Sequence, residues 1–430
     1  MNSLIPDLPG PAWRLLGADA LSAVGTGLTL PFLLVYLHSS RGLEVGIVAA
    51  VVASIGLVGF LGNPLGGWLA DRWGARPTLL AGLLVTALGT VAWLGVSRPW
   101  EAFAASALYA LGTSVCWPSQ SSLLSGVVDP HQRSNAFSVG HMTLNTGLGA
   151  GGLLAATIVD VGRPDSFVLL YLVDAATFMG AAGIITFSVP AARRTVNEAG
   201  KYGAGELRKG YRTIVLDRAF VRLWGVTAVL FTAGFGQMAV TFPLVATEYV
   251  GLPAARLGIL YAVNTITVVI LQLIVLRSVA GRQRTRVLML LAISWSASWL
   301  LVLFAGHFGT GVLALTILIA STVVFAFGET LMSTSLAPMA NDLAPQELRG
   351  RYNGAFALAY TTGFAAGPLL AGLLLEFGSI GTLLVTLALL AAGSILGLRG
   401  LERLLPARVN QIPSARIMES DFGSEFPRGA

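Results

Sequence analysis

The sequence predicts an all-α membrane protein with twelve transmembrane helices, and three observations support this fold class. First, only 11% of the 430 residues are charged, where a soluble domain carries about 25%. Second, 55% are hydrophobic and the mean hydropathy is +0.75, so a soluble chain of this length would lack the polar surface to cover itself. Third, apolar stretches of the roughly 20 residues that cross a bilayer recur along the chain. A soluble enzyme is thereby excluded.

The order of these stretches predicts the order of the helices. Nine stretches contain no Asp, Glu, Lys or Arg, and they span residues 20–40, 45–70, 77–97, 102–128, 134–159, 223–247, 257–276, 352–375 and 377–398. A tenth, 166–192, is interrupted only by Asp174. The stretch 287–328 is too long for one helix and contains a glycine-rich break at 306–311, so it supplies two. The runs are apolar on nearly all sides, as in helices that face lipid and one another.

Basic residues in the loops predict that both termini are cytoplasmic. In this orientation the outer loops hold only Arg41, Arg98, Arg163 and Arg256, and the other 23 of the 27 basic residues face the cytoplasm. Because these charges lie between apolar segments and not in one patch, the net charge of +6 does not indicate nucleic-acid binding. We expect a monomeric, multi-pass protein of the bacterial inner membrane, surrounded by the lipid bilayer.

A repeat divides the chain into two halves. The pattern Thr-Gly, Gly and Leu-Leu-Ala within residues 146–155 recurs within 362–371, and one long basic stretch follows the sixth span. Parallel repeats of six spans are typical of a transporter that works by alternating access, with its site between the halves. We therefore predict an N-terminal six-helix bundle (1–189), a cytoplasmic linker (190–219), a C-terminal six-helix bundle (220–403) and a cytoplasmic tail (404–430) that is disordered.

The loop after the second span carries a motif. Residues 67–77 read Gly-Trp-Leu-Ala-Asp-Arg-Trp-Gly-Ala-Arg-Pro. This run resembles the G-x-L-a-D-r-x-G-r-k signature of the major facilitator superfamily, in the loop where that family carries it. With twelve spans, two halves and a basic linker, the resemblance covers nearly the whole chain. It implies the major facilitator fold of two pseudo-symmetric six-helix bundles.

The resemblance also implies that this loop is a conformational latch that holds the outward-open state, formed by Gly67, Asp71, Arg72, Gly74 and Arg76. Glycines permit a tight turn and close helix approach, and an aspartate at this point can accept hydrogen bonds from the end of a neighbouring helix. The equivalent loop of the second half, residues 281–286, is basic but contains no acid. We therefore expect an asymmetric latch.

A glycine-rich run in the fifth span gives a finer resemblance. Residues 147–152 resemble a motif of the drug/proton antiporters of this superfamily, but they lack the proline of that motif. The corresponding run of the second half, 363–368, contains a proline. This resemblance favours efflux over uptake. The run 108–112 lacks the fourth-span arginine of these antiporters, so their usual acid–arginine arrangement is incomplete here.

Three acids lie deep within the predicted spans, where a charge costs at least about 2.5–3.5 kcal/mol and usually faces a cavity or a partner. Asp19 begins a polar stripe in the first span, and Glu329 lies near mid-membrane, about 16 Å from the cytoplasmic end of the tenth. We predict that these two acids couple proton movement, with a structural role as the alternative for Asp19. The sixth span is peripheral in this superfamily, so we expect Asp174 to be structural.

Polar and aromatic side chains within the spans suit a permissive site for lipophilic compounds, often cations. We predict that the substrate cavity is lined by Ser22, Thr26, Trp117, His141, Asn145, Phe231, Phe235, Met238, Phe325 and Tyr360. Ordinary helix packing is the alternative explanation of the aromatic residues, and a buried, hydrogen-bonded histidine is the alternative for His141.

These features predict a secondary transporter, not an enzyme, that exports small amphiphilic or drug-like molecules by proton antiport with alternating access. Such a protein would take part in multidrug efflux and antibiotic resistance. Nutrient uptake by a symporter or uniporter is the alternative, although few Gln and Asn side chains lie in the spans. A channel or a membrane enzyme is a more distant alternative. The sequence has no phosphate-binding loop or metal-ligand cluster and a single cysteine, so we expect no cofactor and no metal.

Overall fold

The computed structural model describes residues 6–159, 164–190, 204–238, 241–252, 256–309 and 311–413. Within these ranges the chain is helical, apart from turns and one isolated antiparallel bridge between Gln283 and Gln411. The prediction of an all-α membrane fold is confirmed.

The first half of the chain forms long helices in the predicted order. They are α1 (Gly10–Thr29), continued by η1 (Leu30–Phe32), α2 (Leu33–Val35) and η2 (Tyr36–Ser40); α3 (Val45–Trp73); α4 (Ala75–Ala92) with η3 (Trp93–Gly95); α5 (Pro99–Val127); η4 (Pro130–Gln132) with α6 (Arg133–Ile158); and α7 (Pro164–Ser188). The first helix begins at Gly10 and not at residue 20, where the predicted span starts. Pro11 favours the start of a helix, and the charged side chains of Arg14 and Asp19 do not break the helix that follows.

The second half repeats this succession of long helices. After α8 (Ala204–Leu216), which lies inside the predicted linker, come α9 (Arg218–Ala233), α10 (Phe235–Met238), α11 (Thr241–Leu244), η5 (Val245–Tyr249), α12 (Leu257–Ser278), α13 (Arg284–Ala305), η7 (Gly306–Phe308), α14 (Val312–Ser333), α15 (Leu336–Leu343), η8 (Gln346–Leu348), α16 (Arg349–Phe377), α17 (Ile380–Glu402) and α18 (Ala407–Asn410). Residues 191–203 of the predicted linker lie outside the described residues.

The seventh predicted span, 223–247, is broken and not continuous. The break falls at Gly234, whose φ of −109° and ψ of −98° end α9. A Cβ atom at this position would lie 2.2 Å from the ring of Trp295. The helix is therefore interrupted where the indole of α13 packs directly against its backbone.

Ten helices within the described residues are long and apolar enough to cross a membrane. The other two predicted spans correspond to α5 and α6, which have 29 and 26 residues but carry more polar side chains, Gln120 and His141 among them. Both have the length to cross a bilayer, so the structure is consistent with twelve spans.

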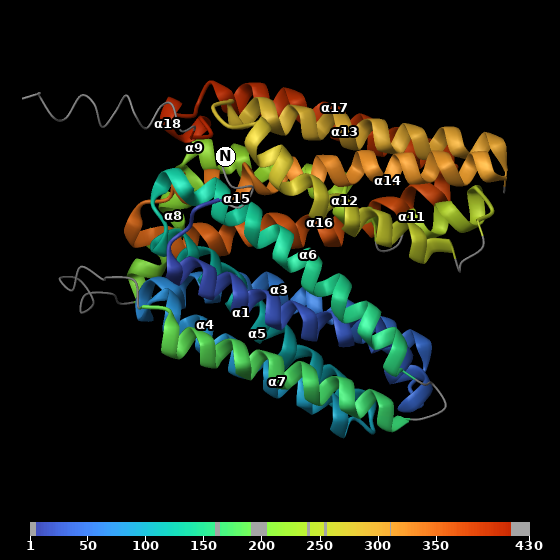
Figure 1. Ribbon diagram of the computed structural model, residues 1–430, viewed down its shortest axis with the longest axis horizontal. Helices are drawn as coiled ribbons and strands as arrows, with labels where there is room; N and C mark the ends of the chain where they lie inside the picture. The colour runs from blue at the N-terminus through green and yellow to red at the C-terminus, as the bar shows by residue number, and fades with distance from the viewer. Residues whose placement is uncertain are drawn as a thin grey trace, which may run out of the picture.

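The long helices form two groups that are close at one end and diverge toward the other (Figure 1). The helices α1 and α3–α7 lie in one group, and α9 and α12–α17 in the other. The short helices α8, α15 and α18 lie at the end where the two groups meet (Figure 1). Across the groups, α3 and α5 pack against α16, and α6 packs against α12 and α14.

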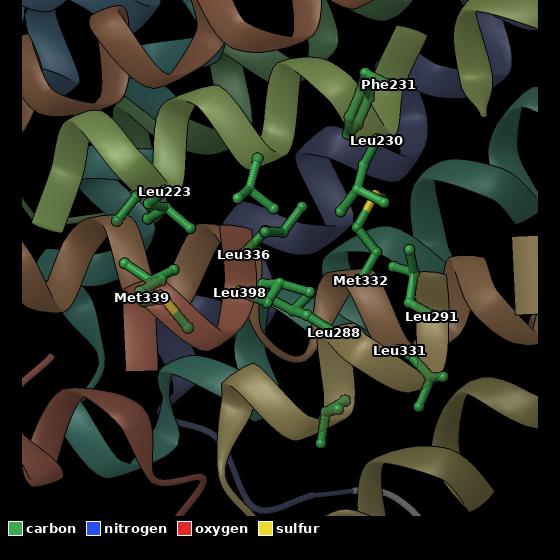
Figure 2. Close-up of a cluster of buried hydrophobic side chains, with 14 of the residues drawn as sticks. Leu223, Leu230, Phe231, Leu288, Leu291, Leu331, Met332, Leu336, Met339 and Leu398 are labelled. Atoms are coloured by element: carbon green, nitrogen blue, oxygen red, sulfur yellow. The ribbon is translucent and has the colours of Figure 1, made fainter. Parts of the chain in front are cut away.

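Each group has its own apolar core. In the second half, leucines and methionines of α9, α13, α14, α15 and α17 form one buried cluster, including Leu223, Leu230, Leu288, Leu291, Leu331, Met332, Leu336, Met339 and Leu398 (Figure 2). In the first half a separate cluster joins α1, α4, α5, α6 and α7. Lipid tails are as apolar as these side chains, so close packing and not the hydrophobic effect drives this association.

The first part of the predicted disordered tail is ordered. Residues 407–410 form α18, and Ile412 pairs with the turn after α12: the nitrogen of Gly281 donates to the Ile412 carbonyl at 2.9 Å, and the Ile412 nitrogen donates to the Arg282 carbonyl at 2.9 Å. The side chains of Val409 and Ile412 are buried. We call residues 406–413 the C-terminal strap. Residues 414–430 lie outside the described residues.

Candidate functional site

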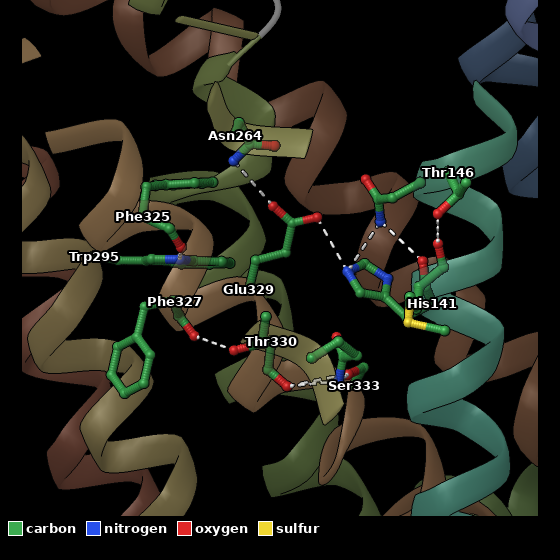
Figure 3. A network of polar contacts seen from close by, with 12 residues as sticks. His141, Thr146, Asn264, Trp295, Phe325, Phe327, Glu329, Thr330 and Ser333 are labelled. Atoms are coloured by element: carbon green, nitrogen blue, oxygen red, sulfur yellow. Dashed lines mark hydrogen bonds and ion pairs between the residues drawn. The ribbon is translucent and has the colours of Figure 1, made fainter. Parts of the chain in front are cut away.

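Glu329 joins the two groups of helices four residues before the end of α14, near the middle of the candidate span Val312–Leu343. Its side chain is 3% exposed, and its Oε1 lies 3.0 Å from Nε2 of His141 on α6. The Nδ2 of Asn264 on α12 donates to the other carboxylate oxygen at 3.3 Å. Figure 3 shows the carboxylate between these two partners. A predicted proton carrier and a predicted cavity residue, 188 positions apart in the sequence, are thus in direct contact.

The contact between His141 and Glu329 can hold a proton in two ways. Its Nε2 lies 3.0 Å from Glu329 and 3.2 Å from Nδ2 of Asn145, whose amide also donates to the His141 carbonyl at 3.0 Å. With Glu329 ionised, the Nε2–H group donates to the carboxylate. With Glu329 protonated, its O–H group donates to an unprotonated Nε2. One proton can therefore reside on either side chain while the contact between the groups is kept.

Aromatic rings surround the carboxylate on the side of the second half. The rings of Trp295 on α13 and Phe325 on α14 stack, with centroids 4.9 Å apart and an angle of 4° between their planes (Figure 3). Phe325 lies one helical turn before Glu329 on the same helix. Phe235 meets both edge-on, at 5.6 Å from Trp295 and 5.9 Å from Phe325. The polarised edges and faces of such rings favour these geometries.

This aromatic row continues into the first half. Phe231 lies 5.3 Å from Phe235 and meets Tyr360 of α16 edge-on at 4.2 Å. Trp117 of α5 in turn meets Tyr360 edge-on at 5.0 Å. Trp117 is 48% exposed, whereas Trp295 is fully buried. Five of the predicted cavity residues thus form one continuous row that runs from an accessible indole to the buried carboxylate.

The polar stripe of the first span lies in different surroundings. Asp19 lines a small cavity together with Leu83 of α4, Gln120 of α5 and Ile185 of α7. The Ser22 hydroxyl donates to the Asp19 carbonyl at 3.0 Å, and the Thr26 hydroxyl donates to the Ser22 carbonyl at 3.1 Å. All the residues around this cavity belong to the first half, so the two predicted proton carriers do not share one site.

Met238, the remaining predicted cavity residue, lies at the end of α10. Its carbonyl accepts a hydrogen bond from the Tyr261 hydroxyl at 2.8 Å, and its side chain packs against the second-half core. It is not part of the aromatic row.

Asp71 forms the first of two connections at the end where the groups meet. Its Oδ1 accepts from the backbone nitrogen of Gly350 at 2.6 Å and its Oδ2 from that of Arg351 at 3.0 Å. The Arg351 guanidinium lies 3.6 Å from the same carboxylate. The first turn of a helix has free N–H groups and a partial positive charge, so this acid of the first half caps α16 of the second.

The other predicted latch residues have separate roles. Gly67 allows α3 to approach α16, because a Cβ at Gly67 would lie 2.4 Å from the carbonyl oxygen of Gly350. Gly74 has a φ of 101° at the turn between α3 and α4, a conformation that favours glycine. The guanidinium of Arg72 lies 5.3 Å from the ring centre of Trp68, and Arg76 donates to the Thr186 carbonyl of α7. The arginines therefore contact their own half.

A second connection at the same end corrects the expectation of an asymmetric latch. Asp342 on α15 supplies the acid that the turn 281–286 lacks: it pairs with Arg133 at the start of α6, and Arg284 Nη1 donates to its Oδ2 at 2.6 Å. Arg284 Nη2 also donates to Ser134 of the first half at 3.2 Å. The two halves are thus joined by one carboxylate from each half.

The C-terminal strap holds this second connection in place. Nη1 of Arg284, whose side chain is 1% exposed, donates to the Val409 carbonyl at 2.8 Å, and the backbone nitrogen of Thr285 donates to Oδ1 of Asn410 at 3.0 Å. A buried guanidinium needs several acceptors, and here the strap provides one of them.

The described contacts between the halves lie between this end and the middle of the spans. From the end inward they include the Asp71 and Asp342 connections, Ser122 with Asn353 at 3.1 Å, Asn63 with Thr361 at 3.0 Å, and finally the Glu329–His141 pair. Beyond these residues the two groups diverge (Figure 1). One end of the interface is therefore closed, and α6 still approaches α12 past the carboxylate, since a Cβ at Gly149 would lie 3.0 Å from Cγ2 of Thr265.

Sequence reasoning did not select several residues of this arrangement. Trp295 and Asn264 complete the surroundings of Glu329, and Asp342 with Arg284 completes the second connection. Asn264 could have been found as one of the few amides within an apolar run. Nothing local distinguishes Asp342 from a solvated loop acid, since its role depends on a partner 209 positions away.

Comparisons with known proteins agree with the described fold. The family model for the Major Facilitator Superfamily matches residues 15–315 and 239–421. An MFS-type transporter of Bacillus subtilis (strain 168), YqjV, is 23% identical over 399 residues, which cover 90% of this chain and 92% of that protein. The multidrug resistance protein MdtH of Yersinia pestis (strain Pestoides F) is 29% identical over 218 residues, 50% of this chain and about half (49%) of that protein's length.

Solved structures share the fold at low sequence identity. FucP in its outward conformation superposes with a TM-score of 0.72 at 16% identity, covering 91% of this chain and 98% of that one. A bacterial homologue of the iron transporter ferroportin, in an outward-facing state, gives 0.71 at 14% identity and covers 91% and 99%. At these identities the likeness concerns the fold alone.

Proposed function

The chain belongs to the major facilitator superfamily, and we propose that it exports lipophilic cations in exchange for protons. It is a multi-pass membrane transporter and not an enzyme. We further propose that the bundles 1–189 and 220–403 are the two moving halves, that the linker 190–219 and both termini face the cytoplasm, and that the membrane is the bacterial inner membrane.

The observation that carries the proposal is the contact between Glu329 and His141 across the two halves. A buried carboxylate is costly while it is charged and unpaired, so it is stabilised by a proton, a protonated partner or a bound cation. Glu329 has a histidine and an amide as polar neighbours and no arginine or lysine among the described ion pairs. Protons and a cationic substrate can therefore compete for one group.

The aromatic row supports the substrate class. A cation near the face of an indole or phenyl ring gains about 0.5–2 kcal/mol, and flat rings also accept varied apolar bodies. The row leads from the half-exposed Trp117 to the carboxylate. The resemblance to a multidrug resistance protein over half of the chain supports the same class of substrate.

The mechanism that we propose is alternating access. In this mechanism the opposite side of the site opens to the outside while the end near Asp71 and Asp342 is closed. Protonation of Glu329 there removes its charge and releases the cation, and the proton is later lost to the cytoplasm when the halves rock. Because His141 is on the other half, the state of this proton changes the contact between the halves directly.

The test uses full-length protein in proteoliposomes with an imposed pH gradient and ethidium as the lipophilic cation. Wild-type protein should move ethidium against its gradient, and Glu329→Gln should abolish this movement. Glu376→Gln is the matched control, because Glu376 is an exposed glutamate at the end of α16 and should have no effect. Asp19→Asn tests the second predicted carrier in the same assay.

Two results would contradict the proposal. Full ethidium export by Glu329→Gln would remove Glu329 from the coupling mechanism. Absence of gradient-driven movement for a panel of lipophilic cations, together with proton-coupled accumulation of a neutral or anionic compound, would favour uptake.

A further inference from the structure

Four arginines that the proposed transport mechanism does not use lie at neighbouring ends of two membrane helices. Arg218 and Arg222 are in the first two turns of α9, and Arg399 and Arg403 are at the end of α17. All four residues are exposed. None of them forms an ion pair among the residues that the structure describes. Their charges are therefore not balanced by the described part of the chain.

A direct contact brings the two pairs of arginines together. A Cβ at Gly400 of α17 would lie 2.6 Å from Nη1 and 3.0 Å from Cζ of Arg222. The Arg222 guanidinium thus packs on the backbone of α17, in space that a larger residue would fill. Arg403 follows Gly400 by three residues and Arg399 by four, so these residues lie on one side of the helix. The arginines of both helices therefore border one surface.

The acids that are nearest in the sequence are engaged elsewhere. Glu402 lies 3.9 Å from Arg286 of α13, and because it follows Gly400 by two residues it is on the other side of α17. Asp217 caps α9: its Oδ1 accepts from the nitrogen of Ala219 at 3.0 Å, and its Oδ2 accepts from the Tyr352 hydroxyl at 2.9 Å. The positive charge at this surface is thus available to a ligand from outside the chain.

Toward the middle of the membrane the same surface is apolar. Leu396, one turn before Arg399, is 72% exposed, and Val229, two turns after Arg222, is 37% exposed. A Cβ at Gly225, between them on α9, would have nothing within 4 Å. The helix α17 lies at the edge of the second group that faces away from the first (Figure 1). We call this surface, formed by residues 218–229 and 396–403, the α9–α17 seam.

We propose that the α9–α17 seam binds an anionic phospholipid, with its phosphate among the arginines and its acyl chains along the apolar part. Arg218 is the first residue of one candidate span and Glu402 the last of another, so the guanidinium groups lie at the level of lipid head groups. A guanidinium offers parallel N–H donors to two phosphate oxygens, and basic pockets between membrane helices suit anionic head groups. A phosphatidylcholine head group fits less well, because its own cation is repelled.

The bound lipid would bridge the first and the last long helix of the second half. It would stabilise their packing where Gly400 admits only the guanidinium of Arg222 between them. The inference requires that the chain spans a membrane, and it depends on neither the proposed substrate nor the proton site at Glu329.

The test uses the full-length protein in dodecyl maltoside, with dioleoyl phosphatidylglycerol (DOPG) and dioleoyl phosphatidylcholine (DOPC) added at equal concentrations. Native mass spectrometry of wild type should show preferential retention of DOPG, and DOPG should give a saturable rise in Tm. Arg222→Gln and Arg403→Gln should each weaken DOPG binding about fivefold, and the double variant about 25-fold. Arg282→Gln is the matched control and should bind like wild type, because Arg282 is exposed at the same end, in the turn before α13, but lies outside the seam.

Because the substituted arginines are exposed, the variants should fold and match the Tm of wild type in DOPC alone. Equal retention of DOPG and DOPC by wild type would overturn the proposal. An equal loss of DOPG in Arg282→Gln would also overturn it, because net charge and not the seam would then attract the lipid. So would an equal rise in Tm with inorganic phosphate, because the ligand would then be a soluble anion.

Discussion

The carboxylate of Asp71 caps the first turn of α16 in the other half, with Oδ1 2.6 Å from the nitrogen of Gly350. The donors of these two hydrogen bonds belong to the polypeptide backbone, so no substitution in α16 can remove them except one to proline. This cap of α16 therefore depends on the acid of the first half and not on which side chains α16 carries at these two positions.

Replacing this cap should loosen the start of α16. An asparagine retains one oxygen but loses the charge, and the loss of a charged helix cap costs about 1 kcal/mol. In Asp71→Asn we expect the amides of Gly350 and Arg351 to exchange with deuterium about fivefold faster than in wild type. Asp165→Asn, at the exposed start of α7, is the control and should leave α16 unchanged. Equal exchange in Asp71→Asn would show that the cap does not hold the helix end.

The close approach of α3 and α16 should not tolerate a methyl group. A Cβ at Gly350 would lie 2.3 Å from the carbonyl oxygen of Gly67, so Gly350→Ala forces two backbones apart. Overpacking of this kind costs about 1–3 kcal/mol. We expect a lower Tm and slower transport, whereas Gly372→Ala on the same helix, with nothing within 4 Å of the added atom, should behave like wild type.

The second connection should be sensitive to loss of a single charge. Asp342→Asn leaves Arg133 and Arg284 without their carboxylate, and breaking a buried ion pair on one side costs about 3–5 kcal/mol. We expect Arg284→Gln to lower the Tm similarly and the double variant to be less destabilised than the sum. Arg286→Gln is the control, because its 3.9 Å pair with Glu402 is 71% exposed on the arginine side. Additive losses would mean that the pair does not interact.

Two truncations test whether the C-terminal strap, and not the residues after it, stabilises the protein. A stop after Leu405 removes the acceptors for Arg284 and Thr285, each worth about 1 kcal/mol, whereas a stop after Pro413 keeps both. We expect the shorter protein to unfold at lower temperature and the longer one to match the full chain. Identical Tm values for the two would assign the strap no part in stability.

The exposed end of the aromatic row should affect affinity and not stability. Trp117→Ala removes a half-exposed indole against Tyr360, so the KM for ethidium should rise about 2- to 30-fold at an unchanged Tm. Trp100→Ala, 63% exposed at the start of α5, controls for the loss of an accessible tryptophan. A decrease of kcat at constant KM would place Trp117 outside the substrate path.

The local sequence pattern was sufficient to predict the helices, but it was not sufficient to predict which helices and side chains contact one another. Long apolar runs marked the spans, and the glycines and the aspartate of residues 67–77 marked the loop that contacts α16. Glu329 was conspicuous because a charge within a membrane span is expensive. Its partner His141 could not be assigned from sequence, since the pairing depends on how α6 meets α14 in space.

Contacts in the folded protein also give roles to two segments whose sequences predicted none. The charged turn 281–286 has no acid of its own, yet its Arg284 shares Asp342 with Arg133, because α15 returns to the same place. The polar residues after 404 suggested disorder, but two buried apolar side chains and the backbone pairing of Ile412 order them. Such contacts are not encoded in the periodicity of either segment.

The strap has a consequence for how the protein is made. A ribosome delivers the chain from its N-terminus, so the helices of the first half are in the membrane long before Val409 and Asn410 exist. Arg284 therefore waits for this acceptor until the long helices of both halves have been synthesised. The connection through Arg284 is completed only when the strap has been synthesised, so this contact between the halves forms after the helices that it joins.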